Sequence, residues 1–262
     1  MPDLWTHYFF SKDVQKDNHL PISWESLYSL GAQGPDFLFY LDFQPWKKKS
    51  GFRFGTLMHQ EKPKELMSYV LTLLEKADDI LRDYLLGFVA HYALDSTAHP
   101  FVFYYAQDPI EHKVLEASID ALLFEERMAR PLRGEDSLAI IDVGKQLPQQ
   151  VVDFYRKVAK DIYDEVLPER VIQSAYRDFR EFLILTRPKG FVRLSLQNLI
   201  EKLGSAPVSQ YIYPETVDPK VLNTNMYEDF MQSYDKGRHK FTRLFEVGPE
   251  CAMRNFEGDL SE

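Results

Sequence analysis

The sequence predicts an all-α protein, a multi-helix bundle, and two observations favour this fold class. Few segments of the 262 residues alternate strictly between apolar and polar side chains, whereas most of the chain repeats its apolar residues at helical spacing. Hydrophobic residues make up 45% of the chain and aromatic residues 14%, so the chain can bury a large core.

The N-terminal half begins with a short predicted helix over residues 23–30, closed by Gly31. Residues 34–55 are dense in aromatic residues, glycine and proline, and they predict a long ordered loop with a helical turn. An amphipathic helix follows over 64–76, where Pro63 suits the first turn.

Two longer helices come next. One runs over 78–98, and we expect Pro100 to end it, because proline lacks a backbone N–H and disfavours helical geometry in the residue before it. His99 then lies at or beyond the C-terminal turn of this helix. The other helix begins near Asp108 and Pro109.

In the C-terminal half, a connection over 131–146 leads to further helices. Three are predicted, at 147–166, 168–186 and 189–203. A loop rich in proline, serine and threonine occupies 204–224, and a last helix lies near 226–246.

The composition excludes several classes of protein. The formal net charge of −9 argues against a general nucleic-acid binder, which needs a basic surface. Cys251 is the single cysteine, so neither an intrachain disulfide nor a cysteine zinc cluster can form. The first residues lack the pattern of a signal peptide, and polar residues interrupt every apolar run well short of membrane-spanning length. These features predict a soluble cytoplasmic protein.

The most informative stretch runs from His91 to Glu116 and reads HYALDSTAHPFVFYYAQDPIEHKVLE. It contains His91, His99 and His112, and Asp95 and Glu116 each stand four residues after a histidine. Residues four apart share one face of a helix, so each pair can direct two ligating atoms to one place. Imidazole and carboxylate together favour zinc or a similar divalent ion.

Each pair alone is weak, because 40 of the 262 residues are acidic and this spacing also arises by chance. The density of histidines strengthens the pattern, and so does the position of His99 four residues after Asp95. Upstream, His7, Asp36 and His59 stand in segments of unusual local composition.

The order of these residues resembles that of the bacterial zinc-dependent phospholipase C family, whose all-α fold is shared by the single-strand-specific nucleases. The order is His7, Asp36, His59, His91-xxx-Asp95-xxx-His99, His112-xxx-Glu116. The resemblance covers roughly residues 1–130. We expect residues 131–262 to form a helical extension that shapes one wall of the cleft, within a single domain of 1–262.

The resemblance implies a cleft that holds clustered zinc ions. The ligands of one zinc would be His59, His91 and Asp95. The ligands of a second zinc would be His99, His112 and Glu116.

A third site would contain His7, with Asp95 bridging. In the secreted enzymes a free N-terminal tryptophan is also a ligand of that zinc, whereas Trp5 is internal here. Removal of Met1 would expose Pro2, and we hypothesise that its imine and carbonyl take that place. We therefore expect two zinc ions, and a third only if this substitution occurs.

Two further residues receive roles from the same comparison, and one from helical spacing. Asp36 matches the carboxylate that orients or deprotonates the attacking water, and is the candidate catalytic residue. Phe37 falls where the phospholipases place an aromatic residue near the head group. Asp120 continues the helical stripe of His112 and Glu116, and we expect it to support the site rather than to bind metal.

Clustered zinc ions bind phosphate oxygens and lower the pKa of a water. We therefore expect a zinc-dependent phosphoesterase that uses metal-activated water to hydrolyse a small phosphodiester, such as a phospholipid at its head group. The alternatives are a nuclease or nucleotide phosphatase on the same metal cluster, or a non-catalytic metal-binding module. An HD-type phosphohydrolase is set aside, because no histidine is followed by aspartate.

Residues 37–54, with Trp46 and the neighbouring lysines, suit a transient contact with a membrane surface. Aromatic core packing with solvated lysines is the favoured interpretation of the same segment. Nucleic acid is not expected as a partner. The sequence leaves the substrate and the oligomeric state open.

Overall fold

The computed structural model describes residues 4–44, 46–48, 53–132, 135–185, 213–214 and 216–260. Across these residues the protein is all-α, with nine α-helices and no β-strand, as predicted. The N-terminal helices are α1 (Leu4–Asp17), α2 (Glu25–Gly31), α3 (Phe54–Gln60), α4 (Pro63–Leu74), α5 (Asp79–Tyr105) and α6 (Pro109–Met128). The C-terminal helices are α7 (Gln149–Tyr163), α8 (Glu169–Leu185) and α10 (Thr224–Glu246), and short 3₁₀ helices lie at η1 (Asp36–Tyr40) and η4 (Pro249–Cys251).

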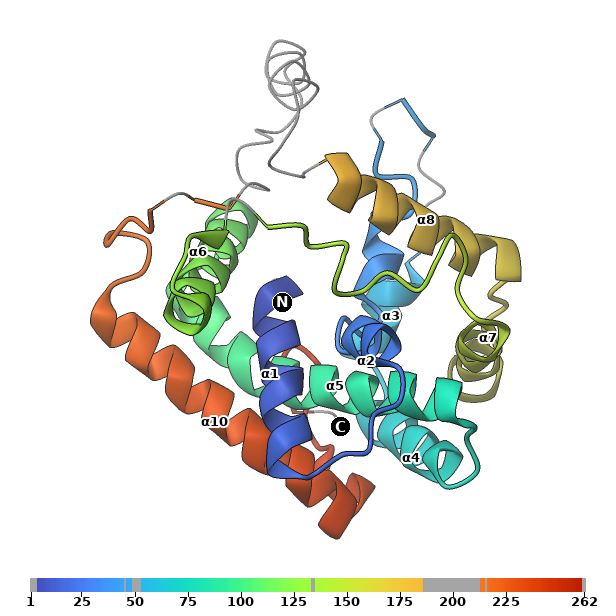
Figure 1. Cartoon of the computed structure of the whole chain (residues 1–262). Helices are drawn as coiled ribbons and strands as arrows, with labels where there is room; N and C mark the ends of the chain where they lie inside the picture. The colour runs from blue at the N-terminus through green and yellow to red at the C-terminus, as the bar shows by residue number, and fades with distance from the viewer. Residues whose placement is uncertain are drawn as a thin grey trace.

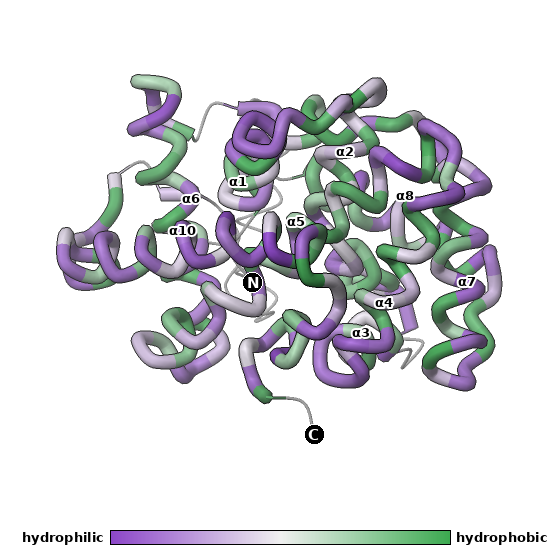
Figure 2. The backbone as a smooth tube through the Cα atoms, turned by 90° about the horizontal axis from the view of Figure 1, so that it is seen from below, coloured by the Kyte–Doolittle hydropathy of each residue, from purple (hydrophilic) through white to green (hydrophobic). Residues whose placement is uncertain are grey.

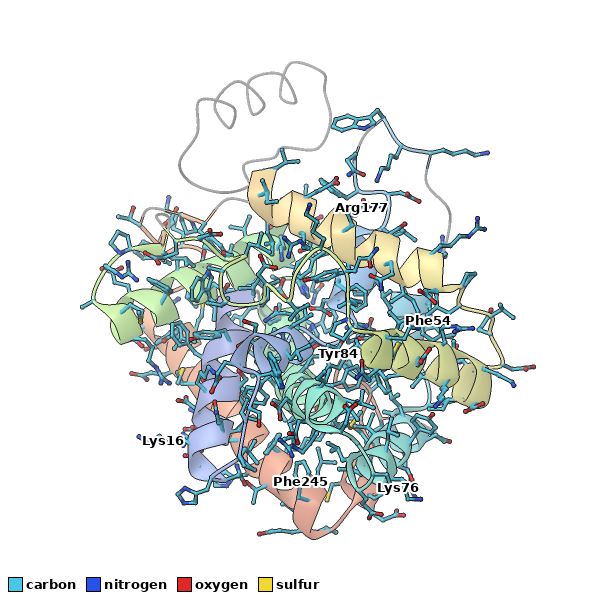
Figure 3. The ribbon with its side chains drawn as sticks, turned by 45° about the vertical axis from the view of Figure 1, so that its right-hand side comes forward. Lys16, Phe54, Lys76, Tyr84, Arg177 and Phe245 are labelled. Carbon is cyan, nitrogen blue, oxygen red and sulfur yellow. The ribbon has the colours of Figure 1, made fainter. Side chains whose placement is uncertain are left out.

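Helix α5, 27 residues long, is the centre of the molecule. It contacts α1, α2, α4, α6, α7 and α10, which surround it in Figure 1. Its residues are buried on nearly every side, as expected of a helix enclosed by its neighbours. Figure 3 shows Tyr84 of α5 deep among other side chains, whereas Lys16, Lys76 and Phe245 lie at the periphery.

The helices of the C-terminal half have one buried face each. Figure 2 shows hydrophobic and hydrophilic residues interleaved along α7 and α10, as expected of amphipathic helices that cover a core. Helix α8 packs on η1, and α10 packs on α5 and α1. Helices of the C-terminal half therefore pack on η1, α1 and α5, three of the elements that carry candidate ligands.

The start signals of three helices are confirmed. Pro63 is the first residue of α4. The Asp78 carboxylate accepts a hydrogen bond from the N–H of Leu81 at the start of α5, and Asp108 caps α6 in the same way. Helices α7, α8 and α10 begin and end within a few residues of the predicted bounds, whereas the predicted helix at 189–203 lies outside the described residues.

The prediction that Pro100 ends the fifth helix is wrong, since α5 continues to Tyr105. The missing hydrogen bond is offset by packing: Phe101 and Val102 are buried, and Gly258 lies against the proline ring. His99 therefore belongs to the helix and stands one turn after Asp95.

Gly31 is the last residue of α2, within the helix rather than beyond it. A Cβ atom on Gly31 would lie 2.0 Å from the carbonyl oxygen of Tyr84, and one on Gly87 would lie 2.1 Å from that of Tyr28. The two glycines thus let the backbones of α2 and α5 touch where the helices cross.

Helices α1 and α3 were not predicted. Helix α1 buries Leu4, Trp5, Phe9 and Phe10, so its apolar residues lie on several sides and give no period of 3.6. Within the described part of the chain, no helix combines the length and apolarity that a bilayer crossing requires. The division of the single domain at residue 130 stays a prediction.

Candidate metal centre

Three candidate ligands lie on one stripe of α5. His91, Asp95 and His99 are spaced four residues apart, and all three are fully or almost fully buried. The Nε2 atom of His91 lies 3.2 Å from Oδ2 of Asp95. The i+4 spacing seen in the sequence therefore does place these side chains together.

Four residues from three elements form the first cluster. They are Asp36 at the start of η1, His59 of α3, and His91 and Asp95 of α5. One nitrogen or oxygen atom from each lies within 4.8 Å of those from the others, and all four residues are buried. Oδ1 of Asp36 is 3.1 Å from Nε2 of His59 and 3.5 Å from Nε2 of His91.

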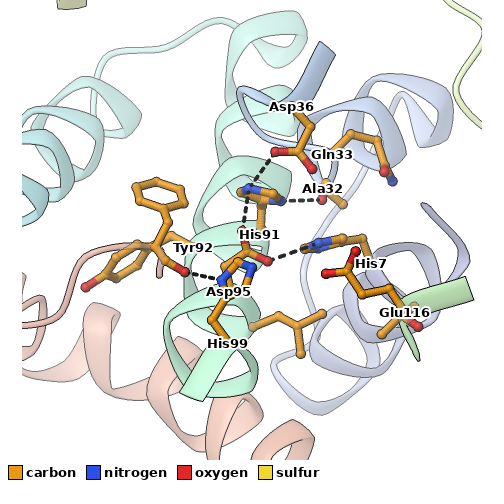
Figure 4. A network of polar contacts seen from close by, with 12 residues as sticks. His7, Ala32, Gln33, Asp36, His91, Tyr92, Asp95, His99 and Glu116 are labelled. Atoms are coloured by element: carbon orange, nitrogen blue, oxygen red, sulfur yellow. Dashed lines mark hydrogen bonds and ion pairs between the residues drawn. The ribbon is translucent and has the colours of Figure 1, made fainter. Parts of the chain in front are cut away.

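His7 of α1 reaches the same carboxylate from another side. Its Nε2 atom lies 3.2 Å from Oδ1 of Asp95, and its ring stacks on that of His91 at 4.4 Å. The other oxygen of Asp95, Oδ2, faces His91 and is 3.9 Å from Nε2 of His59. Asp95 thus directs its two oxygens to different histidines (Figure 4). Such a carboxylate can bridge two metal ions.

The second cluster joins α5 to α6. It contains His99, His112 and Glu116, and one ligating atom from each lies within 4.8 Å of the others. Nε2 of His112 is 2.9 Å from Oε1 of Glu116. The HxxxE pair predicted from the sequence therefore meets a histidine from the neighbouring helix.

Backbone carbonyls hold three of the histidines by their Nδ1 atoms. His59 donates to the carbonyl of Gly55 at 2.7 Å, and His91 to that of Ala32 at 3.2 Å. His99 donates to the carbonyl of Phe256. A carbonyl can only accept, so Nδ1 carries the proton and Nε2 keeps the lone pair that a metal needs.

The electrostatics of the clusters favour metal binding. Burial lowers the pKa of His99 to about 3, so its imidazole is neutral at physiological pH. Burial alone would raise the pKa of Asp95, but the positive charge that His91, His99 and His7 carry when protonated holds it well below its usual value. A neutral histidine beside an ionised carboxylate is the state in which both bind metal.

Several atoms of the first cluster and of the adjoining His7 have no hydrogen-bond partner among the described residues. They are both ring nitrogens of His7, Nε2 of His91 and both carboxylate oxygens of Asp95. Buried polar atoms are nearly always hydrogen-bonded, so this concentration of unbonded nitrogen and oxygen atoms calls for a ligand. Zinc prefers such a set of imidazole and carboxylate ligands, so the residues present fit this ion.

Asp120 supports the site from α6, as expected. Its buried carboxylate accepts hydrogen bonds from the N–H of Trp5 at 2.8 Å and from the N–H and hydroxyl of Thr6 at 2.8 and 2.6 Å. These bonds satisfy N–H groups at the first turn of α1, one residue before His7. The position of His7 relative to Glu116 therefore depends on Asp120.

Phe37 is not available to a substrate, because it is fully buried and packs on Tyr155. The idea that it lies near a head group is therefore wrong. Two other aromatic rings border the clusters. Phe39 is 46% exposed and packs against His59, and Phe103 is 41% exposed and packs against His99 and His112.

No feature of the sequence indicates the role of Phe256. Its contribution to His99 comes from a backbone carbonyl, which every residue has, so no side-chain pattern could have indicated it. The candidate N-terminal ligand Pro2 lies outside the described residues.

Comparison with known proteins identifies the family. A family model described as zinc-dependent phospholipase C matches residues 6–168, which is more than half of the chain. The match contains all the candidate ligands of the two clusters and His7, and it continues past residue 130. Comparisons with curated proteins and with solved structures gave no match. The chain belongs to the zinc-dependent phospholipase C family.

Proposed function

We propose that this member of the zinc-dependent phospholipase C family hydrolyses a phosphodiester with a water activated by clustered zinc ions. The observation that carries the proposal is the convergence of His7, His59 and His91 on the buried carboxylate of Asp95. A carboxylate with no hydrogen bond among the described residues, facing three imidazoles, suits a centre with more than one metal ion.

The two clusters would each hold one zinc. The ligands of the first would be His59, His91 and Asp95, as the family resemblance implies. The ligands of the second would be His99, His112 and Glu116. His7 would share a third ion with Asp95, and the number of ions bound remains part of the proposal.

Asp36 is the proposed catalytic base. Zinc, when bound, attracts the phosphate oxygens and makes a nearby water more acidic. The Asp36 carboxylate lies at the edge of the first cluster, 3.1 Å from His59, where it can orient that water and take its proton. The same position also suits a fourth ligand of the first zinc, and the Asp36→Asn variant separates the two roles.

The proposed substrate is a small phosphodiester, with a phospholipid head group as the preferred class. Phe39 and Phe103 would contact the part of the substrate next to the phosphate, because both rings are partly exposed and adjoin ligand histidines. Exposed aromatic rings also suit the bases of a single strand, so nuclease activity is the alternative tested beside it.

Membrane contact through residues 37–54 remains a proposal. Lys47 forms an ion pair with the buried Asp178 at 2.7 Å, and Tyr40 and Phe43 pack on Phe182. Part of this segment therefore packs on α8 and is not free to contact a membrane. Trp46, 74% exposed, is the side chain through which we propose a transient contact.

The test is a panel of phosphoesters offered to zinc-loaded protein: phosphatidylcholine, bis-nitrophenyl phosphate, single-stranded DNA and mononucleotides. We expect turnover of a phosphodiester that a chelator abolishes and zinc restores. Turnover of DNA alone would favour the nuclease. Zinc binding with no turnover of any compound would indicate a non-catalytic module.

Asp95→Asn should lose both bound zinc and turnover, because this carboxylate faces the imidazoles of His7, His59 and His91. We expect its affinity for zinc to fall by roughly 100-fold or more. Asp153→Asn, a change of a surface carboxylate on α7, is the matched control and should leave both unchanged. Asp36→Asn should keep zinc while turnover falls by about 10²–10⁴-fold. An Asp95→Asn protein with normal turnover would refute the proposed centre.

A further inference from the structure

One residue near the C-terminus contacts a candidate ligand of each cluster. The backbone N–H of Phe256 donates to the carbonyl of His59 at 3.0 Å, and its own carbonyl accepts the Nδ1–H of His99. The Phe256 ring is fully buried and packs against the rings of His59 and His91 at 5.1 and 5.6 Å. Phe256 lies outside the residues 6–168 that define the family match.

Phe256 belongs to a turn that we call the C-terminal strap, residues 254–260. A β-bridge pairs Arg254 with Leu260 across the strap. Asn255 closes it from within: its N–H donates to the carbonyl of Asp259 at 2.8 Å, and its Oδ1 accepts the N–H of Asp259 at 2.9 Å. Its Nδ2 also donates to the carbonyl of Gln60 at 3.2 Å, which ties the strap to the end of α3.

The strap lies along a second stripe of α5, adjacent to the one that carries the ligands. Tyr92 donates its hydroxyl hydrogen to the carbonyl of Arg254 at 2.6 Å. Gly258 lies against Pro100, where an added Cβ would stand 2.5 Å from the ring. With a φ of +82°, this position also favours glycine. The contacts with Tyr92 and Pro100 therefore fix the position of the strap on α5.

We propose that Phe256 is a positioning residue for both clusters, and that the strap fixes the tautomer and the direction of His99 and holds His59 beside it. The Phe256 carbonyl keeps the proton on Nδ1 of His99, and Nε2 then points to the second cluster. Partners of this kind on the far nitrogen of a ligand histidine typically contribute 10–100-fold to metal affinity. This inference rests on the proposed function, because orienting the imidazoles matters only where they bind metal.

The experiment compares Gly258→Ala with Gly248→Ala in the full-length protein. Both glycines have a positive φ, +82° and +91°, but an added Cβ at Gly248 would meet nothing within 4 Å. Gly248→Ala therefore introduces similar backbone strain without moving the strap. Zinc affinity is measured by competition with a chromophoric chelator, and thermal unfolding checks that each protein is folded.

We expect Gly258→Ala to bind zinc about 10–100-fold more weakly than the wild type, and Gly248→Ala to bind as the wild type does. Cobalt replacement gives a second readout. The visible bands of bound Co²⁺ report ligand geometry, so they should change in folded Gly258→Ala and not in Gly248→Ala. A role limited to fold stability would lower the unfolding temperature and leave the bands of the folded protein unchanged.

Asn255→Ala decides the matter if Gly258→Ala does not fold, because it loosens the strap without a steric clash. Wild-type zinc affinity and cobalt bands in the folded variants would overturn the positioning role while leaving the metal centre intact. A wild-type protein that binds no zinc would overturn the proposed function itself, and this inference with it.

Discussion

At the scale of single residues, the position of His91 depends on a glycine that faces it. Gly34 has a φ of +52°, and a Cβ there would lie 2.1 Å from Cδ2 of the His91 ring. The carbonyl of Gly34 accepts the hydroxyl hydrogen of Tyr155 at 3.0 Å, and Tyr155 in turn packs on Phe37. The loop before Asp36 is thus shaped so that the imidazole can enter the first cluster.

Gly34→Ala should therefore displace the His91 ring and weaken zinc binding by about 10–100-fold. Gly144→Ala is the matched control, since Gly144 also has a positive φ, +105°, but nothing lies within 4 Å of an added Cβ. Zinc titration of the two variants measures the difference. Equal zinc affinities of the two variants would show that the His91 ring does not depend on the space beside Gly34.

Part of the site could be predicted residue by residue. The pairs His91–Asp95 and His112–Glu116 follow from the geometry of a helix, because residues four apart share a face. The approach of Asp36 and His59 to these pairs depends on how separate elements pack, so only the family resemblance indicated it. The carbonyls of Gly55, Ala32 and Phe256 could not be predicted, because a backbone acceptor leaves no trace in the sequence.

At the scale of elements, the N-terminus of α1 depends on a carboxylate from α6. Asp120→Ala would remove the acceptor of hydrogen bonds from Trp5 and Thr6 and leave buried N–H groups unsatisfied. We expect the free energy of unfolding to fall by about 3 kcal/mol. Urea unfolding of the metal-free protein measures this loss.

Asp120→Asn retains one side-chain acceptor oxygen, so its loss of stability should be smaller than that of Asp120→Ala. Equal stability of Asp120→Ala and the wild type would show that α1 starts without this cap. The zinc content of the same variants tests whether a displaced α1 also moves His7 away from the metal centre.

Most helices could be predicted because their caps and apolar periods are local. Helix α1 could not, because it is apolar on several sides, and the end of α5 was misplaced because tertiary packing outweighs the effect of Pro100. Both departures bear on the site. Helix α1 carries His7, and the continuation of α5 places His99 in line with Asp95.

At the scale of the whole molecule, a half-buried lysine of α10 that faces α5 links stability to pH. Lys240 donates to the hydroxyl of Ser96 at 2.7 Å and lies 4.4 Å from the ring centre of Tyr92. Burial, with Arg254 nearby, lowers the pKa of Lys240 to about 7. Between that value and about 10.4, the ordinary pKa of lysine, the unfolded chain holds a proton that the folded protein lacks.

The contribution of Lys240 to the free energy of unfolding should therefore rise with pH across this range. Lys240 destabilises the folded protein most at pH 7 and below. Lys240→Met removes the contribution. We expect the variant to be more stable than the wild type at pH 6, and the difference to shrink towards pH 10. Urea unfolding at several pH values measures this, and a difference that does not vary with pH would contradict it.

The central claim is that α1, η1, α3, α5 and α6 together build a zinc centre with two adjoining clusters. The most direct measurement is anomalous scattering at the zinc absorption edge from crystals of zinc-loaded protein. The account predicts one peak among Asp36, His59, His91 and Asp95, and another among His99, His112 and Glu116, each about 2.1 Å from the ligand nitrogens and oxygens. Zinc found only outside these clusters, or none at all, would contradict it.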